Sequence, residues 1–354
     1  MKLMNFSKLM MAALFTSAAF TSCKNGDIEF PDNDGGTTVY FPYQYPVRTI
    51  VLGDDEWDTT LDHAHKCIIK STFGGSYNGS NGSVQVQVDK TLCNNLTFAD
   101  GTPVKVMPDN YYTLSGNTMN FNGTMNGDIE VSLSDAFFAD ADATKATYVI
   151  PLVMTSQTGF GKINNGTWTD NDGTVKTGAD AGAPWRLNSA MWNIVPMDYT
   201  LYCVKFQNKY AGSWVIAYNR ELHSPAGTQN YDFIPETVEK RTPVDFTTQT
   251  LNSVSYNVQF QFGAVVKEAT LVLTFDNTEN CVITTTTPGI TVTGTGNYAD
   301  DGAKQAWNQK DRDMIDIEYT IDFGGGYSVK SKENLIWQRS GVKTTEFIPV
   351  YTQP

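Results

Sequence analysis

Apolar and polar residues alternate along most of the chain from residue 38 onward, which is the pattern of strands with one buried face. SVQVQVD (residues 83–89) places three valines on one side and two glutamines on the other, and DIEVSL (residues 128–133) repeats the pattern. Glycine and asparagine clusters such as GGSYNGSNG (residues 74–82) separate these segments. Short strands with such turns predict an immunoglobulin-like antiparallel sandwich over residues 38–160.

The alternation is stronger in the last part of the chain. VSYNVQFQF (residues 254–262) and MIDIEYTIDF (residues 314–323) each present large apolar side chains to one side and polar side chains to the other. Roughly eight such segments follow one another with tight turns, which predicts an up-and-down, lipocalin-like β-barrel over residues 199–354. The expected fold class is all-β.

Two segments lack any periodicity. Residues 161–198 include the long polar run GKINNGTWTDNDGTVKTGADAGAP, and a connection of this length is typical of a linker or a functional loop. We therefore expect a connecting loop between two domains. Residues 23–37 are rich in Gly, Asp and Asn and predict a flexible tether.

The first 22 residues have the features of a lipoprotein signal peptide. Lys2 and Lys8 precede the apolar run LMMAALFTSAAF, and Cys23 follows two small residues. We expect the Cys23 thiol to be acylated and Cys23 to become the new N-terminus, since two or three acyl chains hold a protein at a membrane at about 0.8 kcal/mol per buried methylene. The alternative is a cleaved signal with an incidental cysteine.

Composition narrows the function classes. The net charge of −13 and the absence of a basic cluster argue against a nucleic-acid partner. Beyond the signal segment, no apolar run approaches the ~20 residues that span a bilayer.

Four further cysteines have no zinc-ligand spacing, so neither a metal nor another cofactor is expected. If they form disulfides, the pairs should lie within domains, as Cys67–Cys93 and Cys203–Cys281. Buried free thiols are the alternative.

Several motifs resemble a known family. PDNYYTL (residues 108–114), SDAFFAD (residues 134–140) and YVIPL (residues 148–152) resemble the end of an N-terminal domain found on Bacteroidetes surface lipoproteins, and residues 47–75 resemble its start. Residues 198–214 are similar to the domain that often follows it in non-enzymatic members. The resemblance implies a Sus-type glycan-binding lipoprotein of the outer membrane that faces the cell exterior, with an oligo- or polysaccharide ligand and a Sus-type importer complex as partners.

The same N-terminal domain family also precedes family-18-type surface endoglycosidases, so catalysis has to be considered. DRDMIDIE (residues 311–318) nearly matches their acidic signature, but Met314 replaces the second acid. That chemistry requires a (β/α)₈ scaffold of about 250 residues, and the final segment is shorter and consists of hairpins. We therefore expect no enzyme activity.

Glycan binding without catalysis uses flat aromatic faces flanked by polar side chains. Tryptophans in polar loops are candidates, whereas Trp214 at a strand start is assigned to the core and Trp57 to an acidic turn. The hypothesised glycan-binding residues are Trp168, Trp185, Trp307, Trp337, Arg186 and Arg339. The predicted function is glycan capture at the cell surface. The alternatives are a structural or adhesive surface subunit, a carrier of a small apolar ligand and, last, a hydrolase.

Overall fold

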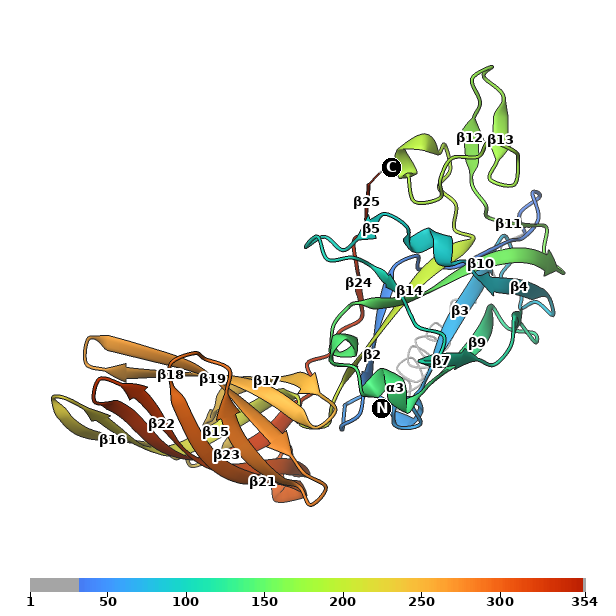
Figure 1. Cartoon of the computed structure of the whole chain (residues 1–354). Coiled ribbons are helices and arrows are strands. Elements are labelled where there is room, and N and C mark those ends of the chain that lie inside the picture. The colour runs from blue at the N-terminus through green and yellow to red at the C-terminus, as the bar shows by residue number, and fades with distance from the viewer. Residues whose placement is uncertain (1–31, 353–354) are drawn as a thin grey trace, which may run out of the picture.

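The computed structural model describes residues 32–352, and its regular secondary structure is mostly strands. Figure 1 shows a large curled sheet at the upper right and a β-barrel at the lower left. The predicted all-β class is confirmed. Among the described residues, no helix is long and apolar enough to cross a bilayer. The predicted signal peptide and Cys23 lie outside the described residues.

The curled sheet, called here the first sheet, contains twelve strands within residues 32–352. Its hydrogen-bonded path is β11-β1-β3-β9-β8-β4-β10-β14-β2-β24, with β6 beside β10 and β7 beside β9. The strands are β1 (Thr38–Tyr40), β2 (Pro46–Val51), β3 (Lys66–Gly74), β4 (Ser83–Val88), β6 (Lys105–Val106), β7 (Tyr112–Leu114), β8 (Thr118–Asn120), β9 (Asn126–Leu133), β10 (Tyr148–Thr158), β11 (Lys162–Ile163), β14 (Tyr199–Gln207) and β24 (Thr345–Glu346).

This arrangement refines the predicted antiparallel sandwich. One curled sheet replaces two separate sheets, and the pairs β1–β11, β10–β6 and β14–β2 are parallel. Its concave side encloses a core that includes Ile69, Val86, Phe137 and Phe206. A second cluster covers the other face of β10 and β14. Because both faces are covered, β10 and β14 read as continuous apolar runs rather than alternating ones.

The barrel closes through eight antiparallel strands, β15-β17-β18-β19-β20-β21-β22-β23, with β23 paired back onto β15. Strand β16 adds to β15 outside this circuit. The strands are β15 (Gly212–Ser224), β16 (Gly227–Phe233), β17 (Thr242–Thr250), β18 (Ser253–Phe262), β19 (Val265–Phe275), β20 (Asn280–Thr285), β21 (Thr291–Trp307), β22 (Lys310–Gly324) and β23 (Tyr327–Arg339). The predicted barrel is therefore present, and its inward-facing apolar side chains fill it.

The barrel begins later than predicted and ends earlier. Residues 199–207 form β14, which pairs with β10 and β2 in the first sheet. After β23 the chain returns to the first sheet, where β24 pairs with β2. Beyond it, β25 (Val350–Tyr351) pairs with β5 (Leu96–Thr97) in a separate two-stranded sheet. Alternation shows that a segment is a strand but not which sheet it joins, and this explains the difference.

The connecting segment carries the small hairpin β12 (Thr167–Thr169) and β13 (Val175–Thr177), which projects from the first sheet at the top of Figure 1. The helices are single turns at loops and rims. They are α2 (Thr60–His63), η2 (Lys90–Cys93), α3 (Asp135–Phe138), η3 (Ala141–Thr144), η4 (Ser189–Met191) and η5 (Val238–Lys240).

The four described cysteines are free thiols, all buried. Cys67 lies in the concave core of the first sheet, Cys93 and Cys203 in its second core, and Cys281 in the barrel. The conditional pairings Cys67–Cys93 and Cys203–Cys281 do not occur, because each would join residues of different cores.

Candidate functional site

A polar cleft of about 470 Å³ lies where the first sheet meets the barrel, and it is called here the junction cleft. One wall comes from β2, the end of β14, η3 and the loop after β2. The other wall comes from the start of β15, β17, the end of β23 and the segment that leaves the barrel. The side chains that line the cleft include Asp55, Glu56, Trp57, Lys205, Gln207, Asp245, Thr248, Arg339, Ser340 and Lys343.

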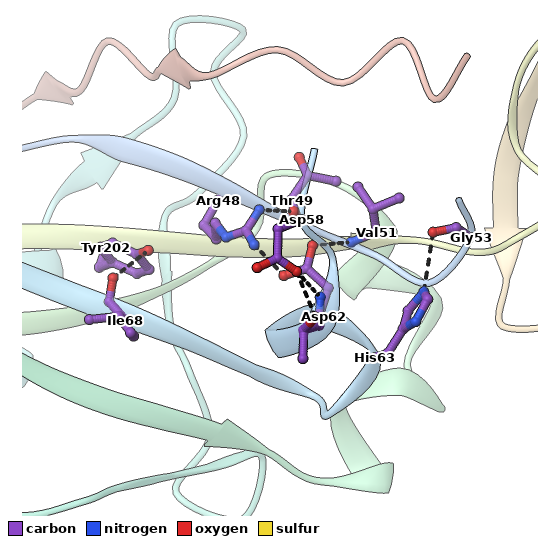
Figure 2. A network of polar contacts seen from close by, with 10 residues as sticks. Arg48, Thr49, Val51, Gly53, Asp58, Asp62, His63, Ile68 and Tyr202 are labelled. Carbon is purple, nitrogen blue, oxygen red and sulfur yellow. Dashed lines mark hydrogen bonds and ion pairs between the residues drawn. The ribbon is translucent and has the colours of Figure 1, made fainter. Parts of the chain in front are cut away.

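Trp57 is the most exposed tryptophan on this surface, with 75% of its area accessible. Its loop connects β2 to α2, and a buried carboxylate fixes that helix. Asp62 in α2 accepts a hydrogen bond from the backbone N–H of Val51 at 2.9 Å and forms an ion pair with Arg48 (Figure 2). Arg48 also donates to the carbonyl oxygen of Thr49 at 2.6 Å. The loop therefore starts at the end of β2, and the helix at its other end is tied back to β2.

Two further contacts hold the Trp57 loop. Asp58 accepts hydrogen bonds from the N–H and the hydroxyl of Thr60, at 3.0 and 2.6 Å, and these bonds lower the pKa of Asp58. The His63 ring lies 3.2 Å from the carbonyl oxygen of Gly53 (Figure 2). A Cβ on Gly53 would lie only 2.9 Å from Cα of Lys209, so glycine permits close packing against the crossover to the barrel.

The barrel side of the junction cleft is also constrained. Gly212 has φ of 129°, and a Cβ there would lie 2.6 Å from the carbonyl oxygen of Arg339. The β15–β23 register shifts between Ser213 and Trp214, which are opposite Arg339 and Trp337. Such a bulge changes the direction in which neighbouring side chains point. Arg339 is exposed and lines the cleft, whereas Trp337 is buried in the barrel.

Asn208, only 1% exposed, joins the two parts of the molecule. Its side-chain amide donates to the carbonyl oxygens of Thr250 and Ser253, and its side-chain oxygen accepts from the N–H groups of Tyr210 and Ala211. Every polar atom of this side chain is thus paired, and its amide ties the crossover to the β17–β18 turn of the barrel. The junction cleft is consequently formed by two walls with a fixed connection.

The charges in the junction cleft are not used for internal ion pairs. Within residues 32–352, none of the cleft's acidic or basic side chains forms an ion pair of 4 Å or less. Asp55 instead accepts a hydrogen bond from the Ser340 hydroxyl at 2.6 Å, which links the Trp57 loop to the barrel. Unpaired donors and acceptors beside an exposed indole are suited to a polyhydroxylated ligand.

The acidic motif at residues 311–318 lies elsewhere, on β22. Asp311 accepts from Lys304 and from the N–H of Gln305. Asp316 accepts from Asn334, and Glu318 pairs with Lys332. These carboxylates have ordinary strand partners. Among the described residues, no group of three His, Cys, Asp or Glu side chains is arranged to hold a metal ion.

The six hypothesised glycan-binding residues do not come together. Trp337 is 3% exposed and Trp168 is 9% exposed, so the prediction that these two are open platforms is wrong. Trp337 packs in the barrel, with the Arg312 guanidinium 5.3 Å from its ring. Trp168 donates to the carbonyl oxygen of Thr177 and is covered by Lys176.

The other four residues lie in three places. Trp185 packs beside Tyr351 against the second core, and Arg186 forms a double hydrogen-bonded ion pair with Asp198. Trp307 ends β21, at a hairpin of the barrel. Only Arg339 lines the junction cleft. The sequence analysis did not select Trp57 as a candidate binding residue. The feature of the sequence that could have indicated it is a tryptophan in an acidic loop without hydrophobic periodicity.

Comparisons with known proteins divide the chain into two familiar parts. Residues 32–161 match a family model described as a "-like, N-terminal domain", and residues 210–341 match a domain of unknown function, DUF5627. Neither model covers half of the chain. No curated protein matches.

A solved structure of unknown function from Bacteroides ovatus is similar over the whole architecture. It has 28% sequence identity and a TM-score of 0.80, over 91% of this chain and 100% of that one. An auxiliary nutrient binding protein from Bacteroides thetaiotaomicron (12% identity, TM-score 0.36, 82% and 90% coverage) and a putative carbohydrate binding protein from Bacteroides ovatus (14%, 0.22, 70% and 67%) are much less similar. The two-part architecture is therefore shared with a Bacteroides protein.

Proposed function

We propose that this protein is a lipid-anchored cell-surface glycan-binding protein that binds an oligo- or polysaccharide in the junction cleft without cutting it. The observation that carries the proposal is the exposed Trp57 ring beside a polar cleft whose charged side chains are not paired with one another.

The chemistry of the junction cleft supports a sugar ligand. An indole face provides rigid apolar area for the C–H side of a pyranose ring at little entropic cost. At the cleft wall, Lys205 provides a donor for hydroxyl groups, and Asp245 and the side-chain oxygen of Gln207 provide acceptors. The Gln207 amide already donates to the carbonyl oxygens of Ala211 and Ser340. The volume of about 470 Å³ is within the usual range of ligand pockets, roughly 300–1,000 Å³.

The cellular context of the proposal comes from the sequence. An acylated Cys23 would hold the protein at the outer membrane, and the tether over residues 23–37 would place both β-rich parts outside the cell. In that position the protein would capture glycan for a Sus-type importer complex. Replacement of Cys23 by serine should release the protein from the envelope fraction into the medium.

The test of the binding site is a glycan array with the mature chain (residues 23–354), followed by affinity measurements on the best glycan. Trp57→Ala should weaken binding about tenfold or more, because it removes the stacking surface. Tyr77→Ala is the matched control, since Tyr77 is also an aromatic residue on a surface loop and is 72% exposed. Equal affinity of the Trp57→Ala variant and the wild type would contradict the proposed site.

A second measurement addresses catalysis. Incubation with the same glycan panel should release no new reducing ends, and the bound glycan should be recovered at its original length. The appearance of shorter products that persists in highly purified protein would overturn the non-catalytic assignment.

A further inference from the structure

The barrel has an opening in its wall at the end away from the first sheet. Residues 218–224 of β15 pair with β16, whereas residues 212–216 pair with β17. Strand β17 in turn pairs with β18 only up to Tyr256. The outer part of β18 and the free edge of β16 therefore have no strand between them. Figure 1 shows the β15–β16 and β18–β19 hairpins spreading apart there.

A cavity of about 370 Å³ fills this opening, which is called here the barrel mouth. Tyr218 and Arg220 come from β15, Tyr231 from β16 and Phe260 from β18. Tyr231 is 45% exposed. The barrel mouth is separate from the junction cleft, since the two share no lining residue.

Arg220 is held rigidly at the base of the barrel mouth. Its Nη2 and Nε atoms donate to Glu333 at 2.7 and 3.2 Å. The centre of its guanidinium lies 3.8 Å from the Tyr218 ring centroid and 5.1 Å from the Phe260 ring centroid. Burial disfavours the charged guanidinium, but the neighbouring Glu333 keeps the pKa of Arg220 above its ordinary value. Arg220 is therefore a fixed, charged donor.

Glu333 anchors this arrangement from inside the barrel. It is 3% exposed and accepts hydrogen bonds from the hydroxyls of Tyr319 at 2.7 Å, Ser331 at 2.8 Å and Tyr256 at 3.3 Å. A buried ion pair is often no more stabilising than apolar residues of the same volume. A charged network inside the barrel thus indicates a role beyond stability, and positioning Arg220 is the role that the geometry offers.

The unused hydrogen-bonding groups of the barrel mouth are both donors and acceptors. Among residues 32–352, no acceptor contacts Nη1 of Arg220. Gln229 uses its oxygen to accept from Tyr231, which leaves its amide N–H₂ available. Tyr231 donates its hydroxyl proton to Gln229, which leaves the lone pairs of its phenol oxygen available. A hydroxyl group both donates and accepts, so a sugar residue can satisfy all three.

We infer that the barrel mouth is a second saccharide-binding site, specific for a neutral sugar residue that stacks on Tyr231 and hydrogen-bonds to Arg220 and Gln229. The charges of Arg220 and Glu333 cancel, so a carboxylate on the ligand would add a negative charge that the site does not compensate. This inference uses only the barrel mouth's own groups. It rests on the proposed function in one respect, which is that a single long glycan contacts both sites.

The distance between the two sites suits a polymer. From Ser213, in the junction cleft, to Arg220, in the barrel mouth, β15 runs seven residues, which corresponds to roughly 23 Å. A chain of several sugar units would reach across this distance. Occupation of both sites by one chain raises the apparent affinity without any new contact, because the second binding event is intramolecular.

The experiment is an NMR titration of the ¹⁵N-labelled mature chain with the methyl glycosides of glucose, galactose and mannose, and with glucuronic acid as the charged comparator. At least one neutral glycoside should shift the side-chain amide signals of Gln229 in a saturable way, more strongly than glucuronic acid does. Tyr231→Ala should weaken this response about fivefold to tenfold, and Trp57→Ala should leave it unchanged. Tyr231 is partly exposed, so this variant avoids the folding defect expected of a change at Arg220. No saturable shift with any neutral glycoside, or a stronger response to glucuronic acid, would overturn the inference.

Affinity measurements with the glycan found on the array distinguish the proposed site in the junction cleft from the second site in the barrel mouth. If Trp57→Ala abolishes binding and Tyr231→Ala changes neither the affinity nor the NMR response, the second site is wrong and the proposed function stands. If Tyr231→Ala weakens binding and Trp57→Ala does not, the junction cleft is wrong and the second site stands. Loss in both variants, with a larger effect for longer chains, supports both.

Discussion

The first sheet and the barrel place buried carboxylates in different surroundings. In the first sheet, Asp62 and Asp198 are each 3% exposed at the side chain, but the arginines that pair with them, Arg48 and Arg186, remain 34% and 29% exposed. These pairs lie at the rim and fasten loops onto strands. In the barrel, Arg220 is 14% exposed and Glu333 is fully buried. The same chemistry therefore fixes a surface loop in one part and organises an interior in the other.

The difference has an energetic consequence. Water still solvates the arginine of a rim pair, so the charge that remains after loss of its partner is partly screened. An interior charge that loses its partner has no solvent to replace it. The barrel should accordingly be the part of the molecule that is more sensitive to removal of a single charged side chain.

The largest predicted effect is for Glu333→Ala. This change leaves the Arg220 charge unpaired and removes the acceptor of the Tyr256 and Tyr319 hydroxyls. We expect a loss of about 3–5 kcal/mol in the free energy of unfolding of the barrel, measured by denaturant titration with hydrogen exchange of the barrel amides. Glu318→Ala is the control on the neighbouring strand, where the exposed pair with Lys332 should be worth less than about 1 kcal/mol. Similar losses in the two variants would contradict the comparison.

The next effect concerns the connection between the two parts. Asn208→Ala removes four hydrogen bonds at the buried crossover and should cost about 2–3 kcal/mol, because backbone groups of Tyr210, Ala211, Thr250 and Ser253 lose their partner. Limited proteolysis should then cut within residues 207–212. Asn219→Ala, at an exposed asparagine of β15, should change neither stability nor cleavage. Resistance of the Asn208→Ala variant to proteolysis would show that other contacts fix the crossover.

A smaller effect distinguishes two aspartates by pH. Hydrogen bonds from Thr60 lower the pKa of Asp58 in the first sheet's loop, whereas burial raises the pKa of Asp313 in the barrel even though Tyr298 donates to it. The lowered pKa of Asp58 means that its contribution to stability is present above about pH 4 and is lost as the pH falls through its folded value. The raised pKa of Asp313 gives the opposite sign, with stability lost as the pH rises through its folded value.

Replacing each aspartate with asparagine tests the predicted direction of its pH dependence of stability. Asp58→Asn should reduce the loss of stability on acidification, and Asp313→Asn should reduce the loss between about pH 4 and neutral pH. Unfolding free energies measured across this range for each variant and the wild type provide the comparison. Parallel curves for a variant and the wild type would remove that aspartate from the explanation.

The smallest effect is expected for the reactivity of the buried cysteine thiols, which should not differ between the first sheet and the barrel. Burial raises the pKa of Cys67, Cys93, Cys203 and Cys281 to about 12, so none presents a reactive thiolate at neutral pH. In a Cys23→Ser variant, a thiol reagent should label no cysteine in the folded state and four after unfolding, and a reductant should not change the melting temperature. Fewer than four labels after unfolding would indicate a disulfide.

Hydrophobic alternation was sufficient to predict the strands and the closed barrel, because a segment with one apolar face must bury that face. It did not predict that β14 joins the first sheet. Nor did it predict that β24 returns there or that β25 pairs with β5, since two-residue strands have no period to detect. Strand partners depend on contacts between distant segments, and one sequence carries no direct record of these.

The candidate site was harder to predict for the same reason. A tryptophan next to polar residues in the sequence, such as Trp168, proved to be covered by its own hairpin. Trp57 was assigned to an acidic turn, yet the Arg48–Asp62 pair fixes its loop on the first sheet and the Ser340–Asp55 hydrogen bond ties that loop to the end of the barrel. The junction cleft combines segments from residue 49 to residue 343, so no local motif could reveal it.

The late return of the chain to the first sheet has a consequence for biogenesis. Phe347 fills a position in the second core, and β24 covers the edge of β2 at Pro46 and Val47. Because these residues follow every strand of the barrel in the chain, the first sheet can be completed only after the whole barrel has been synthesised. The barrel has all of its strands before then, so its folding does not have to wait for the part of the chain that completes the first sheet.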